Sequence, residues 1–200
     1  MTSTSARTGR PRRSSAEILA DAASELFLEN GYDGTTVDQI AQRAGVSRAT
    51  FFNYFGGKAD LLWLDLDRSL EGLSRALHQA DDLPVVRSVE AALVAVADSH
   101  RAVPWALSQA EAMRLGDDLT ASGAARFVAR NAMVAAYVAE RRGERQDAFW
   151  PQVVSASLLA AAGSAVVVWA RAGIGRGPLV DYVRDAVGPV ATGLAARLQT

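Results

Sequence analysis

Residues 36–54 are organised as two short helical segments joined by a three-residue turn. Each segment begins with a helix-capping signal: Thr36 opens a sequence that resembles a capping box, and Ser47 can cap the second segment. Gly45, which lies between them, allows the chain to change direction sharply. Small and apolar residues at the crossing let the two helices pack closely, so the pattern is that of a helix-turn-helix.

This pattern alone leaves two interpretations open, because short helical turns are common in proteins. The segment is either a DNA-reading module or a three-helix core filled by aromatic side chains. Phe51 and Phe55 are expected in the core of the module. The outward face of the second helix is expected to carry Arg48, Ala49, Thr50, Asn53 and Tyr54.

The rest of the chain also shows helical periodicity, and its high alanine content and only 6 prolines favour helices. A first helix is predicted from Ser14 to a stop at Gly31, and a long fourth helix from about Lys58 to Leu77. Five more helices are predicted after Pro84, at about 85–100, 102–115, 118–142, 147–172 and 178–198. The predicted fold class is therefore all-α, with about nine helices.

The distribution of charge is more informative than the formal net charge of −1. Residues 1–13 carry four arginines and no acidic residue, which predicts a flexible basic arm. Residues 14–60 form the helix-turn-helix module in this scheme, and residues 61–200 form a larger helical domain. The absence of cysteine is compatible with a reducing cytoplasm and excludes disulfides and thiolate metal sites.

The segment 35–62 reads TTVDQIAQRAGVSRATFFNYFGGKADLL. It resembles the DNA-binding signature of the TetR family of transcriptional regulators almost position for position. The resemblance implies a cytoplasmic, ligand-responsive regulator, a repressor by family default, that binds a double-stranded DNA operator. It also implies that the larger domain binds a ligand and dimerises.

The resemblance also implies roles for individual residues, because in such regulators the second helix of the motif enters the major groove. Arg48 is the candidate base reader, since a guanidinium group can bind guanine through two hydrogen bonds. Thr36 and Lys58 match positions that usually contact phosphates. Phe52 departs from the family pattern, in which tyrosine is common. The expected DNA-binding residues are Thr36, Arg48, Ala49, Thr50, Phe52, Asn53, Tyr54 and Lys58.

The stretch from Ala148 to Ala170 contains no charged residue over 23 positions, enough to span a bilayer. No second such segment exists and amphipathic helices surround it, so a core or dimer-interface helix is predicted and no membrane partner. Small residues recur every four positions, which allows two helices to approach closely. The resemblance implies a homodimer through the last two helices. The candidate interface residues are Val153, Ala156, Ala160, Ser164, Val167, Tyr182, Val183, Val187, Val190 and Leu194.

No catalytic, metal or cofactor site is expected. His78 and His100 are too far apart for a paired-ligand motif, and no nucleophile-elbow sequence is present. A helical enzyme or small-molecule-binding protein with a vestigial DNA-binding module remains the alternative. The segment from Trp169 to Val180 is similar to the sensor domains of a TetR subgroup associated with acyl-CoA ligands, so a small hydrophobic effector is expected. Candidate pocket residues are Trp105, Met113, Phe127, Met133, Tyr137, Trp150 and Trp169.

Overall fold

The structure, a computed structural model, describes residues 15–100, 105–110, 112–113, 115–173 and 175–198. Within these ranges every regular element is a helix and none is a strand, which confirms the all-α prediction. The chain divides into two compact units, one that ends at Leu61 and one that begins at Leu62. The basic arm predicted at 1–13 and the cap predicted at Ser14 lie outside the described residues.

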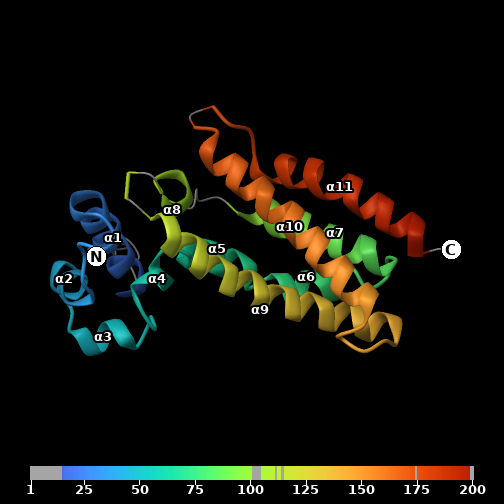
Figure 1. The fold of residues 1–200 in the computed structure, drawn as a ribbon, viewed down its shortest axis with the longest axis horizontal. Helices are drawn as coiled ribbons and strands as arrows, with labels where there is room; N and C mark the ends of the chain where they lie inside the picture. Colours follow the sequence, from blue (N-terminus) through green and yellow to red (C-terminus); the bar gives the residue numbers. More distant parts are fainter. Residues whose placement is uncertain (1–14, 101–104, 111, 114, 174, 199–200) are drawn as a thin grey trace, which may run out of the picture. The chain divides into compact units, whose positions relative to one another are not determined.

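The first unit is a small bundle of short helices (Figure 1). Its core consists of side chains with no exposed surface, among them Leu19, Phe27, Ile40, Phe51 and Leu61. Phe55 is 6% exposed, so the prediction that Phe51 and Phe55 belong to the core is confirmed. The helices of this unit are α1 (Ser15–Asn30), α2 (Val37–Arg43), α3 (Arg48–Phe52) and α4 (Lys58–Leu61).

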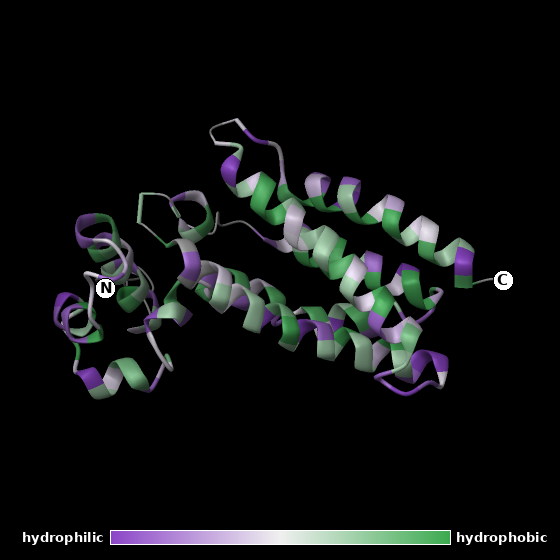
Figure 2. Ribbon diagram, in the orientation of Figure 1, coloured by the Kyte–Doolittle hydropathy of each residue, from purple (hydrophilic) through white to green (hydrophobic). Residues whose placement is uncertain are grey.

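The second unit is built around α7, which packs against α6, α9, α10 and α11. Hydrophobic residues run along its long helices, whereas the connection between α9 and α10 is hydrophilic (Figure 2). The helices of this unit are α5 (Leu64–Leu70), α6 (Leu73–Gln79), α7 (Val85–Ser99), α8 (Trp105–Ser108), α9 (Gly116–Arg142), α10 (Phe149–Arg171) and α11 (Leu179–Leu198).

Two helix predictions were wrong. The long helix expected at 58–77 is divided into α4, α5 and α6 by turns at residues 62–63 and 71–72. The leucine periodicity continues across both turns, but Gly72 lowers helix propensity at the second, by about 1 kcal/mol relative to alanine. The helix expected at 102–115 is reduced to α8 within the described residues. The described residues therefore contain eleven helices rather than about nine.

Helix α10 is long and apolar enough to cross a membrane. In the second unit it packs against α7, α9 and α11. Val154, Leu158, Ala162 and Ala165 are among its buried residues. These contacts are those of a core helix, one of the two alternatives, core or dimer interface, that the sequence predicted.

A polar network joins α9 to the connection between α6 and α7. The buried Tyr137 hydroxyl donates to Asp81 Oδ1 at 2.7 Å and accepts a hydrogen bond from Arg141 at 2.8 Å. Arg141 also donates to Asp81 and to the carbonyl of Leu83, at 2.9 Å in each case. The hydrogen bond from Tyr137, followed by that from Arg141, lowers the pKa of Asp81. Tyr137 is therefore a structural residue of the second unit.

Candidate nucleic-acid interface and ligand cavity

The turn between α2 and α3 is stabilised by its own backbone and by caps on both helices. Gly45 has a φ of 70°, and the Val46 amide donates to the carbonyl of Ala41 at 3.0 Å. Thr36 caps α2 with a capping box, and the Ser47 hydroxyl accepts from the amide of Thr50 at 3.0 Å. The left-handed φ favours glycine, so this turn is encoded locally and fixes where α3 begins.

The end of α2 is tied to α1 by ion pairs. Arg43 donates to Glu29 at 2.8 Å and to Glu25 at 3.2 Å. The hydrogen bond to Glu29 raises the pKa of Arg43, and the same bond lowers the pKa of Glu29. Arg43 and Glu29 therefore stay charged near neutral pH, and Arg43 has a structural role.

Arg48 lies at the first position of α3 with 60% of its side chain exposed. Its guanidinium donates to Asp38 Oδ1 at 2.6 Å, and Cζ lies 5.2 Å from the centroid of the Phe52 ring. An aromatic ring and a carboxylate thus hold the guanidinium from two sides. The ring of a tyrosine at position 52 could make the same contact, so this contact does not explain the departure from the tyrosine pattern.

The other residues expected at the DNA are on the surface of the first unit. Phe52 and Tyr54 are 45% and 51% exposed. Ala49 and Asn53 are exposed and Thr50 is half-buried. The Thr36 side chain is exposed, although its hydroxyl already takes part in the cap of α2. Side chains from the start of α2 and from α3 thus remain accessible to a partner.

Lys58 has a second role that the sequence did not predict. Its ammonium group donates to the carbonyls of Tyr32, at 2.7 Å, and Thr35, at 3.2 Å, and lies 4.0 Å from the centroid of the Tyr32 ring. The side chain is half-buried. Lys58 therefore fastens the start of α4 to the loop between α1 and α2.

Replacing Lys58 by methionine is expected to affect both stability and DNA binding. Two carbonyls lose a charged donor, so the free energy of unfolding should fall by about 1–3 kcal/mol. If the ammonium also contacts a phosphate, affinity should weaken for all sequences, and the slope of affinity against salt should fall by about 1. Urea unfolding and fluorescence anisotropy measure the two effects. Lys58→Arg, which keeps the charge, should retain the slope. An unchanged slope for Lys58→Met would show that Lys58 does not contact a phosphate.

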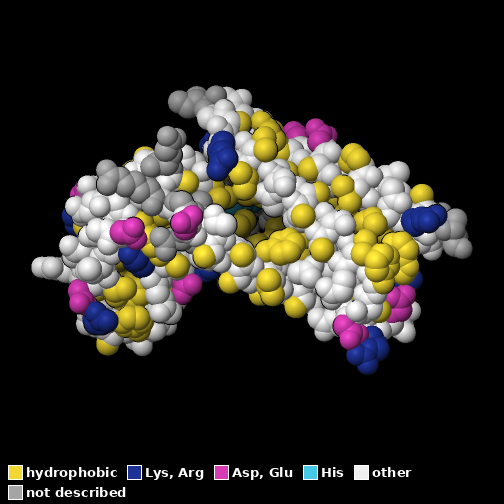
Figure 3. All heavy atoms as spheres, in the orientation of Figure 1, with side chains coloured by type: hydrophobic (Ala, Val, Ile, Leu, Met, Phe, Trp, Pro, Cys, Tyr) yellow, Lys and Arg dark blue, Asp and Glu magenta, His cyan; other side chains and the backbone are white. Residues whose placement is uncertain are grey.

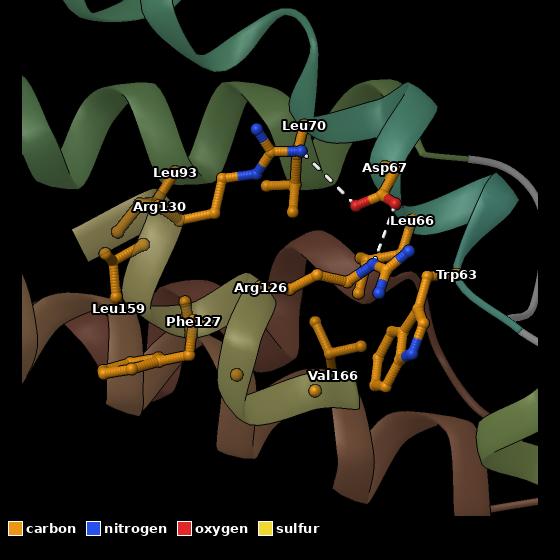
Figure 4. A pocket seen from close by; sticks show the side chains of 13 residues that line it. Trp63, Leu66, Asp67, Leu70, Leu93, Arg126, Phe127, Arg130, Leu159 and Val166 are labelled. Atoms are coloured by element: carbon orange, nitrogen blue, oxygen red, sulfur yellow. Dashed lines mark hydrogen bonds and ion pairs between the residues drawn. The ribbon is translucent and has the colours of Figure 1, made fainter. Parts of the chain in front are cut away.

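The second unit contains an apolar cavity of about 140 Å³. Figure 4 shows the side chains around it, and Figure 3 shows apolar side chains gathered on one face beside a hollow. It is bounded by α5, α7, α9 and α10. The charged residues of the lining are Asp67, Arg126 and Arg130, and the full lining is Trp63, Leu66, Asp67, Leu70, Leu93, Gly123, Arg126, Phe127, Arg130, Leu159, Ala162, Gly163 and Val166.

The charged end of this cavity is an ion-pair cluster beside Trp63. Asp67 accepts from Arg126 at 2.9 Å and from Arg130 at 3.4 Å. Cζ of Arg126 lies 5.6 Å from the centroid of the Trp63 ring, and the indole N–H of Trp63 donates to Ser122 at 2.8 Å. The cavity therefore has an apolar wall and one charged edge, where two guanidinium groups share a carboxylate.

Of the seven residues expected in the pocket, Phe127 lines this cavity. Met113, Tyr137 and Trp169 are buried, and Trp105, Met133 and Trp150 are half-buried, away from its lining. For these six a pocket role stays a prediction, because large apolar residues on helices are as typical of core packing as of a pocket. Trp63, Asp67, Arg126 and Arg130 were missed. The spacing of Arg126 and Arg130 on one helical face, with Phe127 between them, is the signal that was available.

The candidate interface residues separate into two groups. Val183 and Val187 are 2% and 0% exposed, so they pack in the core of their own subunit, and the expectation that they face a partner was wrong. The other candidates are accessible. Ala160 and Ser164 are exposed, and the half-buried ones are Val153, Ala156, Val167, Tyr182, Val190 and Leu194.

The first unit has the architecture of a helix-turn-helix DNA-binding module. Residues 19–62 match the family of bacterial regulatory proteins called tetR, and residues 83–195 match the MftR C-terminal domain. The chain belongs to the TetR family and carries a C-terminal domain of the MftR type. It is a DNA-binding transcriptional regulator and not an enzyme.

Full-length relatives agree with this assignment. The chain is 30% identical over 169 residues to the mycofactocin biosynthesis transcriptional regulator MftR of Mycobacterium tuberculosis, covering 82% of this chain and 84% of that protein. NalD, a repressor of a multidrug efflux pump in Pseudomonas aeruginosa, is similar with a TM-score of 0.55 and 24% identity, over 90% and 96% of the two chains. FadR of Thermus thermophilus, solved with lauroyl-CoA, has a TM-score of 0.51 and 24% identity, over 89% and 94%. The two solved structures share the fold.

Proposed function

We propose that this regulator is a cytoplasmic repressor that leaves a palindromic operator when a small hydrophobic metabolite binds its second unit. The observation that carries the proposal is the apolar cavity with a charged edge. Apolar cavities with a few convergent polar groups are the usual form of small-molecule sites. Trp63 in the cavity wall follows Leu61, the last core residue of the DNA-binding unit, by two positions.

The proposed DNA contacts centre on α3. Arg48 reads a base in the major groove, and Ala49, Thr50 and Asn53 lie on the same short helix or at its end. Thr36, Tyr54 and Lys58 contact the phosphate backbone, and Phe52 positions Arg48. The exposure of Arg48 and Tyr54 and the contact between Arg48 and Phe52 support these assignments.

The proposed dimer forms through α10 and α11. Ala156, Ala160 and Ser164 recur at four-residue spacing on α10 and are not buried by their own subunit. Small residues at this spacing let a helix from a second subunit approach closely. A symmetric dimer would present two α3 helices to the two halves of a palindrome.

The proposed effector is an acyl-CoA or another apolar metabolite. The cavity lining is mostly aliphatic and aromatic, and the likeness to FadR, solved with lauroyl-CoA, supports acyl-CoA as the first compound to test. The effector releases DNA only if it binds better to the conformation with a low affinity for the operator. Repression follows from this coupling when the unliganded dimer is the DNA-binding form.

The test is release of DNA from the purified protein. A labelled fragment from upstream of its own gene, or one selected from random sequence, is bound and then titrated with octanoyl-CoA, lauroyl-CoA and free CoA. The acyl esters should lower the anisotropy in a saturable way, and free CoA should have a much weaker effect because it lacks the apolar chain. If no acyl ester changes either the anisotropy or the melting temperature, acyl-CoA is excluded as the effector.

A further inference from the structure

The charged edge of the cavity contains one acid shared by two bases. Asp67, on α5, accepts one hydrogen bond from Arg126 and one from Arg130, both on α9, through its two carboxylate oxygens (Figure 4). The three side chains are 32%, 23% and 28% exposed, so solvent and solutes reach them. Two guanidinium groups therefore share one carboxylate beside an apolar space.

We propose that Asp67 occupies the place of the effector's acidic group. The ligand is an amphiphile with a carboxylate or phosphate on a compact apolar group, and its acid displaces Asp67 from Arg126 and Arg130. This inference rests on the proposed effector site and specifies that the effector carries an acidic group. Arg126 and Arg130 suit such an effector, because guanidinium groups bind carboxylate and phosphate through paired hydrogen bonds.

The apolar part of the ligand is limited by the size of the cavity. About 140 Å³ is available, close to the volume of an engineered apolar cavity that binds benzene, so an apolar group of about six carbons fits without rearrangement. A second cavity of about 50 Å³ lies next to it and shares Leu66, Leu70, Leu93, Ala162 and Val166 with it. A longer chain can extend through this shared wall.

Displacement of Asp67 would loosen α5. No residue of α5 is buried, and its N-cap, Trp63, makes no capping hydrogen bond through its side chain. The ion pairs of Asp67 are therefore a large part of what ties α5 to α9. Helix α5 begins three residues after Leu61, where the DNA-binding unit ends. A ligand whose acidic group replaces Asp67 as the partner of Arg126 and Arg130 thus acts on the segment that follows the DNA-binding unit.

The first experiment compares ligands on the full-length wild-type protein. Octanoate, octanoyl-CoA, 1-octanol and inorganic phosphate are titrated by calorimetry at one salt concentration. The inference predicts that octanoate or octanoyl-CoA binds about tenfold or more tightly than 1-octanol. Binding of octanoate alone identifies a free carboxylate as the group recognised, and binding of octanoyl-CoA alone identifies its phosphates. Equal binding of the alcohol and the acids, or binding of none of them, overturns the inference.

The second experiment removes the competing carboxylate. Asp67→Asn keeps the shape of the side chain and should raise the affinity for the acidic probes about tenfold, with little change for 1-octanol. Asp65→Asn removes the same charge from the same helix, outside the cavity lining, and should leave both affinities unchanged. Arg130→Gln should abolish the preference for the acid. An unchanged acid affinity in a folded Asp67→Asn protein, or an equal gain in Asp65→Asn, contradicts the inference.

The outcomes also separate this inference from the proposed function. If the acids bind selectively and respond to Asp67→Asn but the operator stays bound, the site is correct and its role in DNA release is wrong. If 1-octanol releases the operator as effectively as octanoate, regulation by an apolar ligand stands and selection of an acid is wrong.

Discussion

Arg48→Ala is expected to lower the affinity for the preferred operator by roughly 5- to 150-fold, corresponding to about 1–3 kcal/mol, and to broaden the sequence preference. The variant removes the one guanidinium group at the start of α3. Among the described residues this group pairs with Asp38 and contacts the Phe52 ring, and the side chains of Arg48 and Asp38 are more than half exposed. Exposed ion pairs contribute at most about 1 kcal/mol, so the fold should tolerate the change. Selection from random DNA followed by anisotropy measures both effects.

Arg43→Ala is the matched control for this experiment. It removes the same type of side chain from α2, but Arg43 pairs with Glu25 and Glu29 on α1. A small loss of stability is expected, with the sequence preference retained. If Arg48→Ala selects the same operator as the wild type with the same preference at each position, Arg48 does not read a base.

Ala160→Arg is expected to give a monomer that binds the full operator about 100- to 10,000-fold more weakly than the dimer. The loss is this large because one subunit no longer holds its partner near the second half-site. Ala160 is exposed in the isolated subunit, so an arginine can be accommodated without disturbing the core. At the proposed interface, in contrast, it would place a bulky charge between closely packed helices. Light scattering and anisotropy measure the mass and the affinity.

Ala136→Arg provides the corresponding control, since Ala136 is an exposed alanine on α9 and lies outside the proposed interface. This variant should remain a dimer with wild-type affinity. A dimeric Ala160→Arg protein that binds the operator normally would show that this face of α10 is not the interface.

The DNA-binding unit could be predicted in detail from its sequence because its structure is determined locally. The caps at Thr36 and Ser47 and the left-handed Gly45 act within a few residues, and the aromatic residues Phe51 and Phe55 follow the helical period into the core. Local signals of this kind are visible without any knowledge of the tertiary structure.

The cavity could not be predicted in the same way. Trp63 and Asp67 are about sixty positions away from Arg126 in the sequence, and the tertiary packing of the second unit, in which α5 lies against α7, decides that they meet. The prediction that Val183 and Val187 face a second subunit was wrong for the same reason. Periodicity identifies an apolar face of α11, but it does not show whether a face packs inside the subunit or against a second one.

The breaks in the helix expected at 58–77 have a different origin. The leucines keep a helical period through the whole segment, so the pattern contains no stop signal at residues 62–63. The buried Trp63 is held by its hydrogen bond to Ser122, far away in the sequence, and the turn occurs beside it. Tertiary contacts override the local preference at this position.

Sequence-specific DNA binding is tested most directly by fluorescence anisotropy of the purified protein against DNA from upstream of its own gene and a scrambled copy, across a series of salt concentrations. We expect the genomic fragment to bind far more tightly than the scrambled one, and both affinities to fall steeply as salt increases. We also expect octanoyl-CoA to remove the specific complex. Equal binding to both fragments, repeated with DNA selected from random sequence, would contradict a sequence-specific regulator.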